Sequence, residues 1–111
     1  MNWLPLTSLE QLQELVSCSE KRPQVIYKHS IRCSISSVVK SRLEKQEAPA
    51  SADFHYLDLI TYRPVSNAIA AQFDVHHESP QILVISKGTC IYDESHMAIN
   101  MDDIAEKVNA A

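Results

Sequence analysis

The most constraining feature of this sequence is a junction at which a buried strand leads directly into a helix. The apolar run Val25–Tyr27 predicts a strand over residues 24–29. From Cys33 onward, apolar residues recur at helical spacing, which predicts a helix that runs to about Gln46. The cysteine therefore lies at a helix N-terminus, where free N–H groups and the helix dipole favour a negative charge.

The residues around this junction make Cys33 a candidate nucleophile. Lys28, His29 and Arg32 can add positive charge beside it, and a thiol in that setting loses its proton more readily than a free cysteine. Because the thiolate is the reactive form, the sequence predicts thiol–disulfide exchange at Cys33. The alternative is that this cysteine is a small buried hydrophobe, as lone cysteines beside apolar strands often are.

The other polar residues of the junction each have two possible roles. Ser30 and Ser36 either donate hydrogen bonds to the thiolate or cap the start of the helix. Side chains alternate along a strand, so only one of Lys28 and His29 is expected to point toward Cys33.

Strand and helix patterns alternate along the whole chain, which predicts an α/β fold. A short strand at Trp3–Leu4 precedes a helix that begins at a capping box of Thr7 and Glu10. The later elements are a strand at residues 54–60, a helix from about Val65, strands at residues 81–86 and 89–92, and a helix capped by Asn100. This order predicts a mainly parallel central sheet with helices on both faces and a C-terminal antiparallel hairpin. Residues 1–111 suit a single domain.

Composition excludes several classes of function. The net charge of -4 argues against non-specific nucleic-acid binding, and no stretch approaches the roughly 20 apolar residues of a membrane span. Residues 1–5 show no signal-peptide pattern. Cys18, Cys33 and Cys90 are odd in number and widely spaced, which predicts neither a disulfide framework nor a metal site. We therefore expect a cytoplasmic protein with reduced thiols that binds neither nucleic acid nor membrane.

Three segments carry a resemblance to a known family. They are Lys28–Ser36 around the cysteine, His77–Gln81 with its Ser-Pro pair, and Gly88–His96 near the C-terminus. Together they resemble the monothiol bacilliredoxins, the YtxJ-like proteins of the bacillithiol system, over nearly the whole chain. The family usually has proline directly after the active cysteine, whereas this chain has Ser34. Proline favours the first helical turn, so its absence loosens the argument for a rigid helix start.

The resemblance implies a fold, an activity and a set of site residues. The fold would be thioredoxin-like, with a cis proline at Pro80 lying against Cys33. The activity would be removal of bacillithiol from client proteins, with bacillithiol as low-molecular-weight thiol co-substrate and no bound cofactor. The residues expected to stabilise the thiolate or position the substrate are Lys28, His29, Ser30, Arg32, Ser36, Ser79 and Pro80.

A thioredoxin-like dithiol site has its second cysteine three residues after the first, and Ser36 occupies that position here. A thiol from elsewhere must then release Cys33 from a mixed disulfide. A low-molecular-weight thiol is one source. Cys18 and Cys90 are the internal alternatives, although neither is expected within the roughly 7 Å Cα separation that a disulfide allows.

Two other functions remain open at this point. The chain is alternatively a redox-inactive binding module, or a redox-sensing module, on a thioredoxin-like scaffold, because fold does not determine function. Iron–sulfur carriage, as in monothiol glutaredoxins with a Cys-Gly-Phe-Ser site, is the third possibility. The segment Cys33–Ser36 lacks that glycine and phenylalanine.

Overall fold

Five strands form one mixed sheet in the computed structural model, which describes residues 1–111. The elements in chain order are β1 (Leu4–Pro5), α1 (Leu9–Cys18), β2 (Gln24–His29), α2 (Ser34–Glu44), β3 (Asp53–Asp58), α3 (Arg63–Phe73), β4 (Gln81–Ser86), β5 (Thr89–Ser95), the 3-10 turn η1 (His96–Ala98) and α4 (Met101–Ala110). The strand order is β1-β3-β2-β4-β5. Strands β1, β3 and β2 pair in parallel, and β4 runs antiparallel to both of its neighbours.

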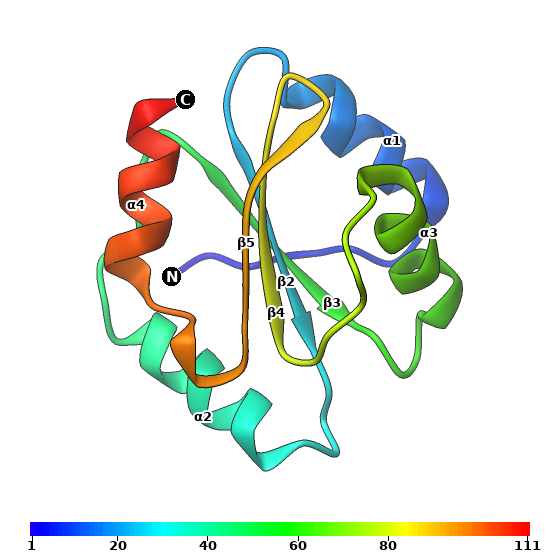
Figure 1. The fold of residues 1–111 in the computed structure, drawn as a ribbon, viewed down its shortest axis with the longest axis vertical. Helices are drawn as coiled ribbons and strands as arrows, with labels where there is room; N and C mark the ends of the chain where they lie inside the picture. The colour runs from blue at the N-terminus through cyan, green and yellow to red at the C-terminus, as the bar shows by residue number, and fades with distance from the viewer.

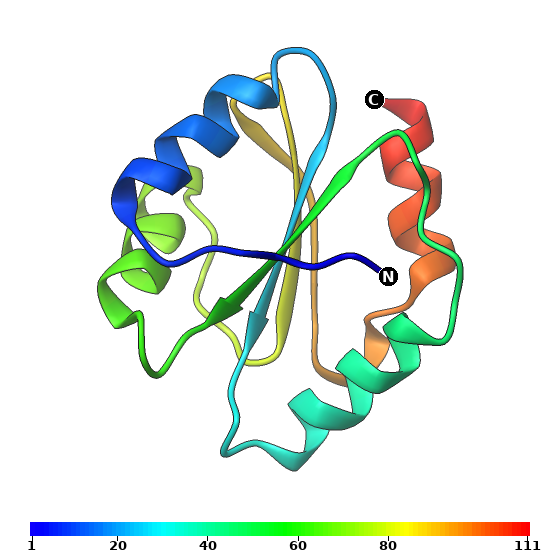
Figure 2. The ribbon, with the colours of Figure 1, turned by 180° about the vertical axis from the view of Figure 1, so that it is seen from behind.

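The predicted architecture of a parallel core with an antiparallel C-terminal hairpin is confirmed, and β4 is the strand that opposes the rest. Helices α1 and α3 cover one face of the sheet, and α2 and α4 cover the other (Figures 1 and 2). Strand β2 lies between β3 and β4 under both layers, so all six of its residues are buried.

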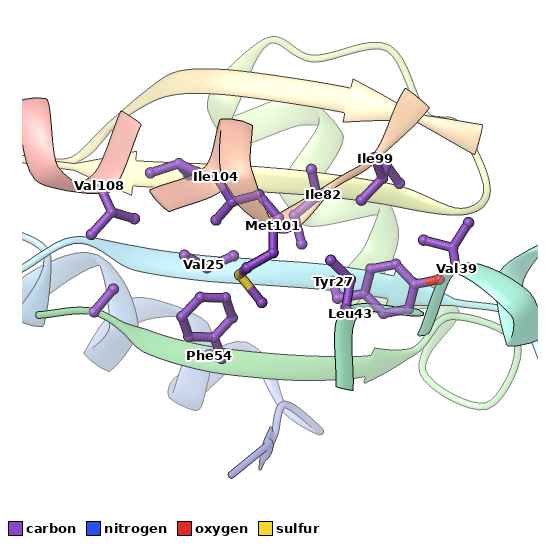
Figure 3. Close-up of a cluster of buried hydrophobic side chains, with 12 residues drawn as sticks. Val25, Tyr27, Val39, Leu43, Phe54, Ile82, Ile99, Met101, Ile104 and Val108 are labelled. Atoms are coloured by element: carbon purple, nitrogen blue, oxygen red, sulfur yellow. The ribbon is translucent and has the colours of Figure 1, made fainter. Parts of the chain in front are cut away.

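Each face of the sheet has its own apolar cluster. Beneath α2 and α4 the cluster includes Val25, Tyr27, Leu43 and Ile104 (Figure 3). Beneath α1 and α3 the cluster consists of Leu6, Leu12, Leu15, Ile26, Leu57, Val65, Ile69, Leu83 and Ile85. The alternation of Val25, Ile26 and Tyr27 between clusters follows from the two-residue repeat of a strand.

Local hydrogen bonds shift several element ends from their predicted places. The predicted capping box at Thr7 and Glu10 is wrong by one residue, because Ser8 Oγ accepts from the Gln11 N–H at 3.1 Å and Gln11 Oε1 accepts from the Thr7 N–H at 2.7 Å. The predicted cap of the last helix is confirmed, since Asn100 Oδ1 accepts from a backbone N–H one turn along.

Three strands also differ from their predicted bounds, and one of them, β5, extends to Ser95, three residues beyond the predicted end. The first strand is Leu4–Pro5, and Trp3 instead packs its ring beside Tyr27 with a centroid distance of 5.8 Å. Strand β3 ends at Asp58, because that carboxylate accepts hydrogen bonds from the backbone N–H groups of Ile60 and Thr61 and so forms a turn.

The register of the central strands determines which segments meet at one edge of the sheet. Lys28 of β2 lies opposite Gln81 of β4. The chain that leaves β2 toward Cys33 and the chain that enters β4 from Ser79–Pro80 are therefore at the same edge (Figure 1). None of the helices is both long enough and apolar enough to cross a lipid bilayer.

Candidate functional site

Cys33 occupies the N-cap position of α2, as the sequence predicts. Its backbone is extended, with φ -108° and ψ 113°. The Cys33 N–H donates to the Ser30 carbonyl at 3.1 Å, and the Cys33 carbonyl accepts from the Ser37 N–H at 3.2 Å. The residue is half-buried and its thiol is free. Backbone hydrogen bonds thus hold Cys33 at the start of α2, and the residue is partly exposed to solvent.

Ser36 is fully buried one turn after Cys33 and is the centre of a hydrogen-bond network. Its Oγ accepts from the Ser30 N–H at 3.1 Å and lies 2.7 Å from His29 Nδ1. The Tyr27 hydroxyl donates to the Ser36 carbonyl at 2.7 Å and lies 3.3 Å from Ser36 Oγ. Figure 3 shows Tyr27 with its hydroxyl directed toward α2. This network joins the end of β2 to the first turn of α2.

The single hydroxyl hydrogen of Ser36 is used inside this network. A serine donates one hydrogen bond, and besides the Ser30 N–H the polar atoms within hydrogen-bond distance of Ser36 Oγ are His29 Nδ1 and the Tyr27 hydroxyl oxygen. Ser30 Oγ accepts from the Arg32 N–H at 3.3 Å, which is a contact of the turn before Cys33, and no side chain caps α2. Both serines are therefore positioned as parts of the helix start, and direct donation to the sulfur stays a prediction.

The pKa values on this face reflect burial. Burial raises the pKa of Tyr27 to about 12, the Ser36 hydrogen bond lowers it, and the nearby Cys33 raises it again. Burial lowers the pKa of His29, and the positive charge of Lys40 lowers it further. These effects favour the neutral imidazole of His29 over its cation.

Lys28 points to the opposite face of the sheet, so the alternation of Lys28 and His29 is as expected. Its side chain has no exposed surface, and its Nζ lies 3.3 Å from His77 Nδ1. Burial lowers the pKa of Lys28 to about 8. Arg32 is exposed in the turn that leads to Cys33.

The Ser79–Pro80 peptide bond is cis, which is the geometry that the resemblance implies. Pro80 is buried and its carbonyl accepts from the His96 N–H at 3.0 Å. Ser79 Oγ is buried without a hydrogen-bond partner. Gln81 Nε2 donates to the His76 carbonyl at 2.9 Å, and this hydrogen bond anchors the loop that precedes β4 to the first residue of that strand.

Three exposed apolar side chains lie within five residues of Cys33 in the sequence. Ile31, Ile35 and Val38 are 63%, 42% and 53% exposed. They lie in the turn before the cysteine and on the outer side of α2. We call these three residues the apolar collar. A group of exposed apolar side chains is typical of a surface that contacts another molecule.

The other two cysteines lie toward the far end of the sheet. Cys90 lies opposite Ile85, and Ile85 lies opposite Gln24, the first residue of β2. Cys18 and Gln24 both line a cavity of about 390 Å³. Burial raises the pKa of the Cys90 thiol. Strand β2 from Gln24 to His29 spans about 17 Å, and Cys33 follows its other end. This separation agrees with the expectation that neither cysteine reaches Cys33.

Sequence reasoning missed the parts played by Tyr27 and His77. The apolar run accounts for Tyr27 only as a strand residue, although a tyrosine buried in a strand needs a partner for its hydroxyl. A lysine within a fully buried strand likewise requires an acceptor, and that signal identifies Lys28 as a residue whose partner must be sought.

Comparisons with known proteins agree with this geometry. The family model "Monothiol bacilliredoxin BrxC" matches residues 4–104. A solved protein provisionally described as an oxidoreductase with a thioredoxin fold is 28% identical, with a TM-score of 0.81, and the match covers 93% of this chain and 90% of that one.

Thioredoxins are similar at lower identity. Thioredoxin from Malassezia sympodialis is 12% identical, with a TM-score of 0.76 and coverage of 98% of this chain and 90% of that one. Thioredoxin from Trypanosoma brucei brucei is 15% identical, also with a TM-score of 0.76, and coverage is 98% and 89%. These likenesses concern the fold, and the predicted thioredoxin-like fold is confirmed.

Proposed function

This chain belongs to the monothiol bacilliredoxin family, and on that premise we propose that it removes bacillithiol from client proteins through the thiolate of Cys33. Family and fold together support a thiol–disulfide oxidoreductase role. The observation that carries the finer proposal is a half-buried cysteine at the N-cap of α2 with serine, and not cysteine, one turn later.

The proposed reaction is an exchange between sulfurs. The Cys33 thiolate attacks the bacillithiol sulfur of a mixed disulfide, and a new bond forms between Cys33 Sγ and that sulfur. The bond to the client sulfur breaks, its electron pair leaves with the client thiolate, and that thiolate takes a proton from solvent. One disulfide replaces another, so the step needs no bound cofactor.

A second thiol must then release the adduct, because Ser36 has no sulfur to offer. Free bacillithiol attacks the adduct, leaves as bacillithiol disulfide and restores the Cys33 thiolate. A reductase that acts on the adduct is the other route. The distance of Cys18 and Cys90 from this end of the sheet favours an external thiol over either of them.

The surface around Cys33 supports a protein as the client. The apolar collar offers contact area that a small polar thiol does not need. The backbone N–H and C=O of Ser79 make no hydrogen bond within the chain. They are free to pair with an extended client segment and hold its disulfide beside Cys33. We place this chemistry in the cytoplasm, where free thiols stay reduced.

The test is single-turnover release of bacillithiol from a modified client peptide, followed by the intact mass of both partners. We expect the wild-type protein to gain one bacillithiol on Cys33 as the peptide loses it. Cys33→Ser abolishes the transfer, whereas Cys18→Ser and Cys90→Ser leave the first turnover intact. Transfer at the normal rate by Cys33→Ser contradicts the proposal, and a parallel peptide modified with glutathione shows which small thiol is preferred.

A further inference from the structure

Lys28 is a buried cation without a carboxylate partner. Its side chain has no exposed surface, and none of the ion pairs in the structure includes it. Its hydrogen-bond partner is the ring of His77, at 3.3 Å. Taking an amine out of water costs free energy that one neutral acceptor recovers only in part. The contact is therefore poorly explained as a device for stability.

The position of the contact suggests another purpose. Lys28 lies on β2 five residues before Cys33, and His77 lies two residues before Ser79. The contact thus joins the strand that leads to the nucleophile with the loop that carries the cis proline.

Two further bonds hold the same loop, residues 76–80. Gln81, the cross-strand neighbour of Lys28, binds the His76 carbonyl at 2.9 Å, and the His96 N–H binds the Pro80 carbonyl at 3.0 Å. With the ends of the loop held in this way, its middle contacts the rest of the chain through His77, at Lys28, and through Glu78, which lies 3.4 Å from His96 Nε2. The Ser79 backbone, like the backbones of His77 and Glu78, has no hydrogen bond within the chain.

We propose that His77 is a positioning residue of the exchange reaction, which acts through Lys28 to hold the Ser79 backbone where the incoming disulfide must lie. His77 does not touch the reacting sulfurs in this scheme. The inference rests on the proposed function, because it needs a disulfide substrate that uses the loop.

The contact depends on the protonation state of His77. Lys28 has only donor hydrogens when charged, so it binds His77 Nδ1 only while that nitrogen is unprotonated. Burial lowers the pKa of His77, the charges of Lys28 and Arg63 lower it further, and Glu78 raises it. The charged and titratable groups around the ring are Lys28 of β2, Arg63 of α3, Glu78 and His76 of the same loop, and His96 of η1, whose Nε2 lies 3.4 Å from Glu78.

Acid conditions therefore release the loop. Once His77 takes up a proton, two donors and two positive charges face each other across the contact, and the hydrogen bond is lost. The loss falls at a lower pH than for an ordinary histidine, because the pKa of His77 is lowered.

Two substitutions at one position separate the acceptor from the titration. His77→Asn keeps an acceptor oxygen near the place of Nδ1 and does not titrate, and His77→Leu removes the acceptor. His76→Leu is the matched control, since the neighbouring side chain is 91% exposed. Two rates are measured for each protein across pH: exchange with a mixed-disulfide peptide, and alkylation of Cys33 by iodoacetamide, which needs the thiolate but not the loop.

The ratio of the exchange rate to the alkylation rate isolates the loop from the ionisation of Cys33. For His77→Leu we expect a ratio roughly tenfold below that of the wild type at pH 7, since small misplacements of a substrate are costly. The wild-type ratio falls in acid, His77→Asn retains its ratio there, and His76→Leu follows the wild type. Wild-type ratios for His77→Leu at every pH overturn the inference, and so does an equal loss of exchange and alkylation, which indicates general damage.

Running the assay with both a bacillithiol peptide and a glutathione peptide separates this inference from the proposed function. Exchange by the wild type with the glutathione peptide alone contradicts bacillithiol as substrate and still measures the His77 effect. Exchange by the wild type with an unchanged ratio in His77→Leu overturns the inference alone. A wild-type protein that exchanges with neither peptide overturns both.

Discussion

Lys28 and His29 are consecutive residues of β2 whose side chains lie on opposite faces of the sheet and contact different segments. His29 reaches α2, the helix that begins at Cys33, and joins a network in which each polar group has a partner. Lys28 reaches the loop that carries Pro80, and three of the four buried side-chain polar atoms without a partner lie there or on that face: Ser66 Oγ, Ser79 Oγ and Gln81 Oε1. The fourth is Arg42 Nε of α2. One face thus stabilises the start of α2 after Cys33, and the other leaves buried polar atoms without partners beside the loop that carries the cis proline.

The largest change in stability is expected on the α2 face, from Ser36→Ala. The substitution leaves the buried Ser30 N–H without its acceptor and His29 Nδ1 without its partner. Leaving buried polar groups unsatisfied costs about 1–3 kcal/mol in the free energy of unfolding. Urea denaturation measures the loss, and Ser37→Ala, at the exposed neighbouring serine, serves as the control. An unchanged unfolding midpoint for Ser36→Ala contradicts the description of this face as a stabilising network.

Acid should weaken the protein through both faces. Burial lowers the pKa of His29 and of His77 below the unfolded value of about 6.5. Between that value and the folded pKa values, the unfolded chain binds more protons, so the free energy of unfolding falls as the pH falls. Below the folded values this contribution levels off.

Denaturation curves at several pH values between 7 and 5 measure this slope. His29→Asn and His77→Asn should each reduce it, and the double substitution should reduce it further. A slope that only one of the two substitutions changes means that the fold keeps only one of these two rings neutral.

A smaller effect is expected from Gly88→Ala, at the end of the sheet away from the site. Gly88 has φ +75° in the β4–β5 turn, and an added Cβ meets no atom closer than 4.0 Å. The cost is therefore backbone strain alone, about 1–2 kcal/mol at most. We expect a modest loss in urea denaturation with the ratio of exchange to alkylation unchanged. A changed ratio contradicts the assignment of the site to the other end.

The smallest change in stability is expected from Lys28→Met. Methionine fills a similar volume and removes the cost of burying an amine, so the free energy of unfolding stays the same or rises slightly. The exchange rate should nevertheless fall, because His77 loses its partner. Urea denaturation measures the stability of Lys28→Met, and the exchange assay on the same sample measures its rate. A loss of stability as large as that of Ser36→Ala contradicts the proposed difference between the two faces.

Local patterns predict the elements well and the contacts between them poorly. The strands over residues 24–29 and 81–86 are predicted to the residue, because a run buried on both faces is a property of the sequence itself. Which of Lys28 and His29 points toward α2 depends on how strand β2 packs against that helix. The contact of Lys28 with His77, 49 positions away, depends on the β2–β4 register, which no local pattern specifies.

The pairing of β2 with β4 also means that β2 gains its second neighbouring strand late in the synthesis of this domain. A nascent chain that ends after α3 already contains Cys33 and its helix, but β2 is then an open edge with unpaired backbone groups. Only when residues 81–86 emerge does β4 cover that edge and bring the proline loop to the same side. Until then, Cys33 is a thiol on an incomplete sheet that lacks its proline loop, so the complete site forms only after β4 has been made.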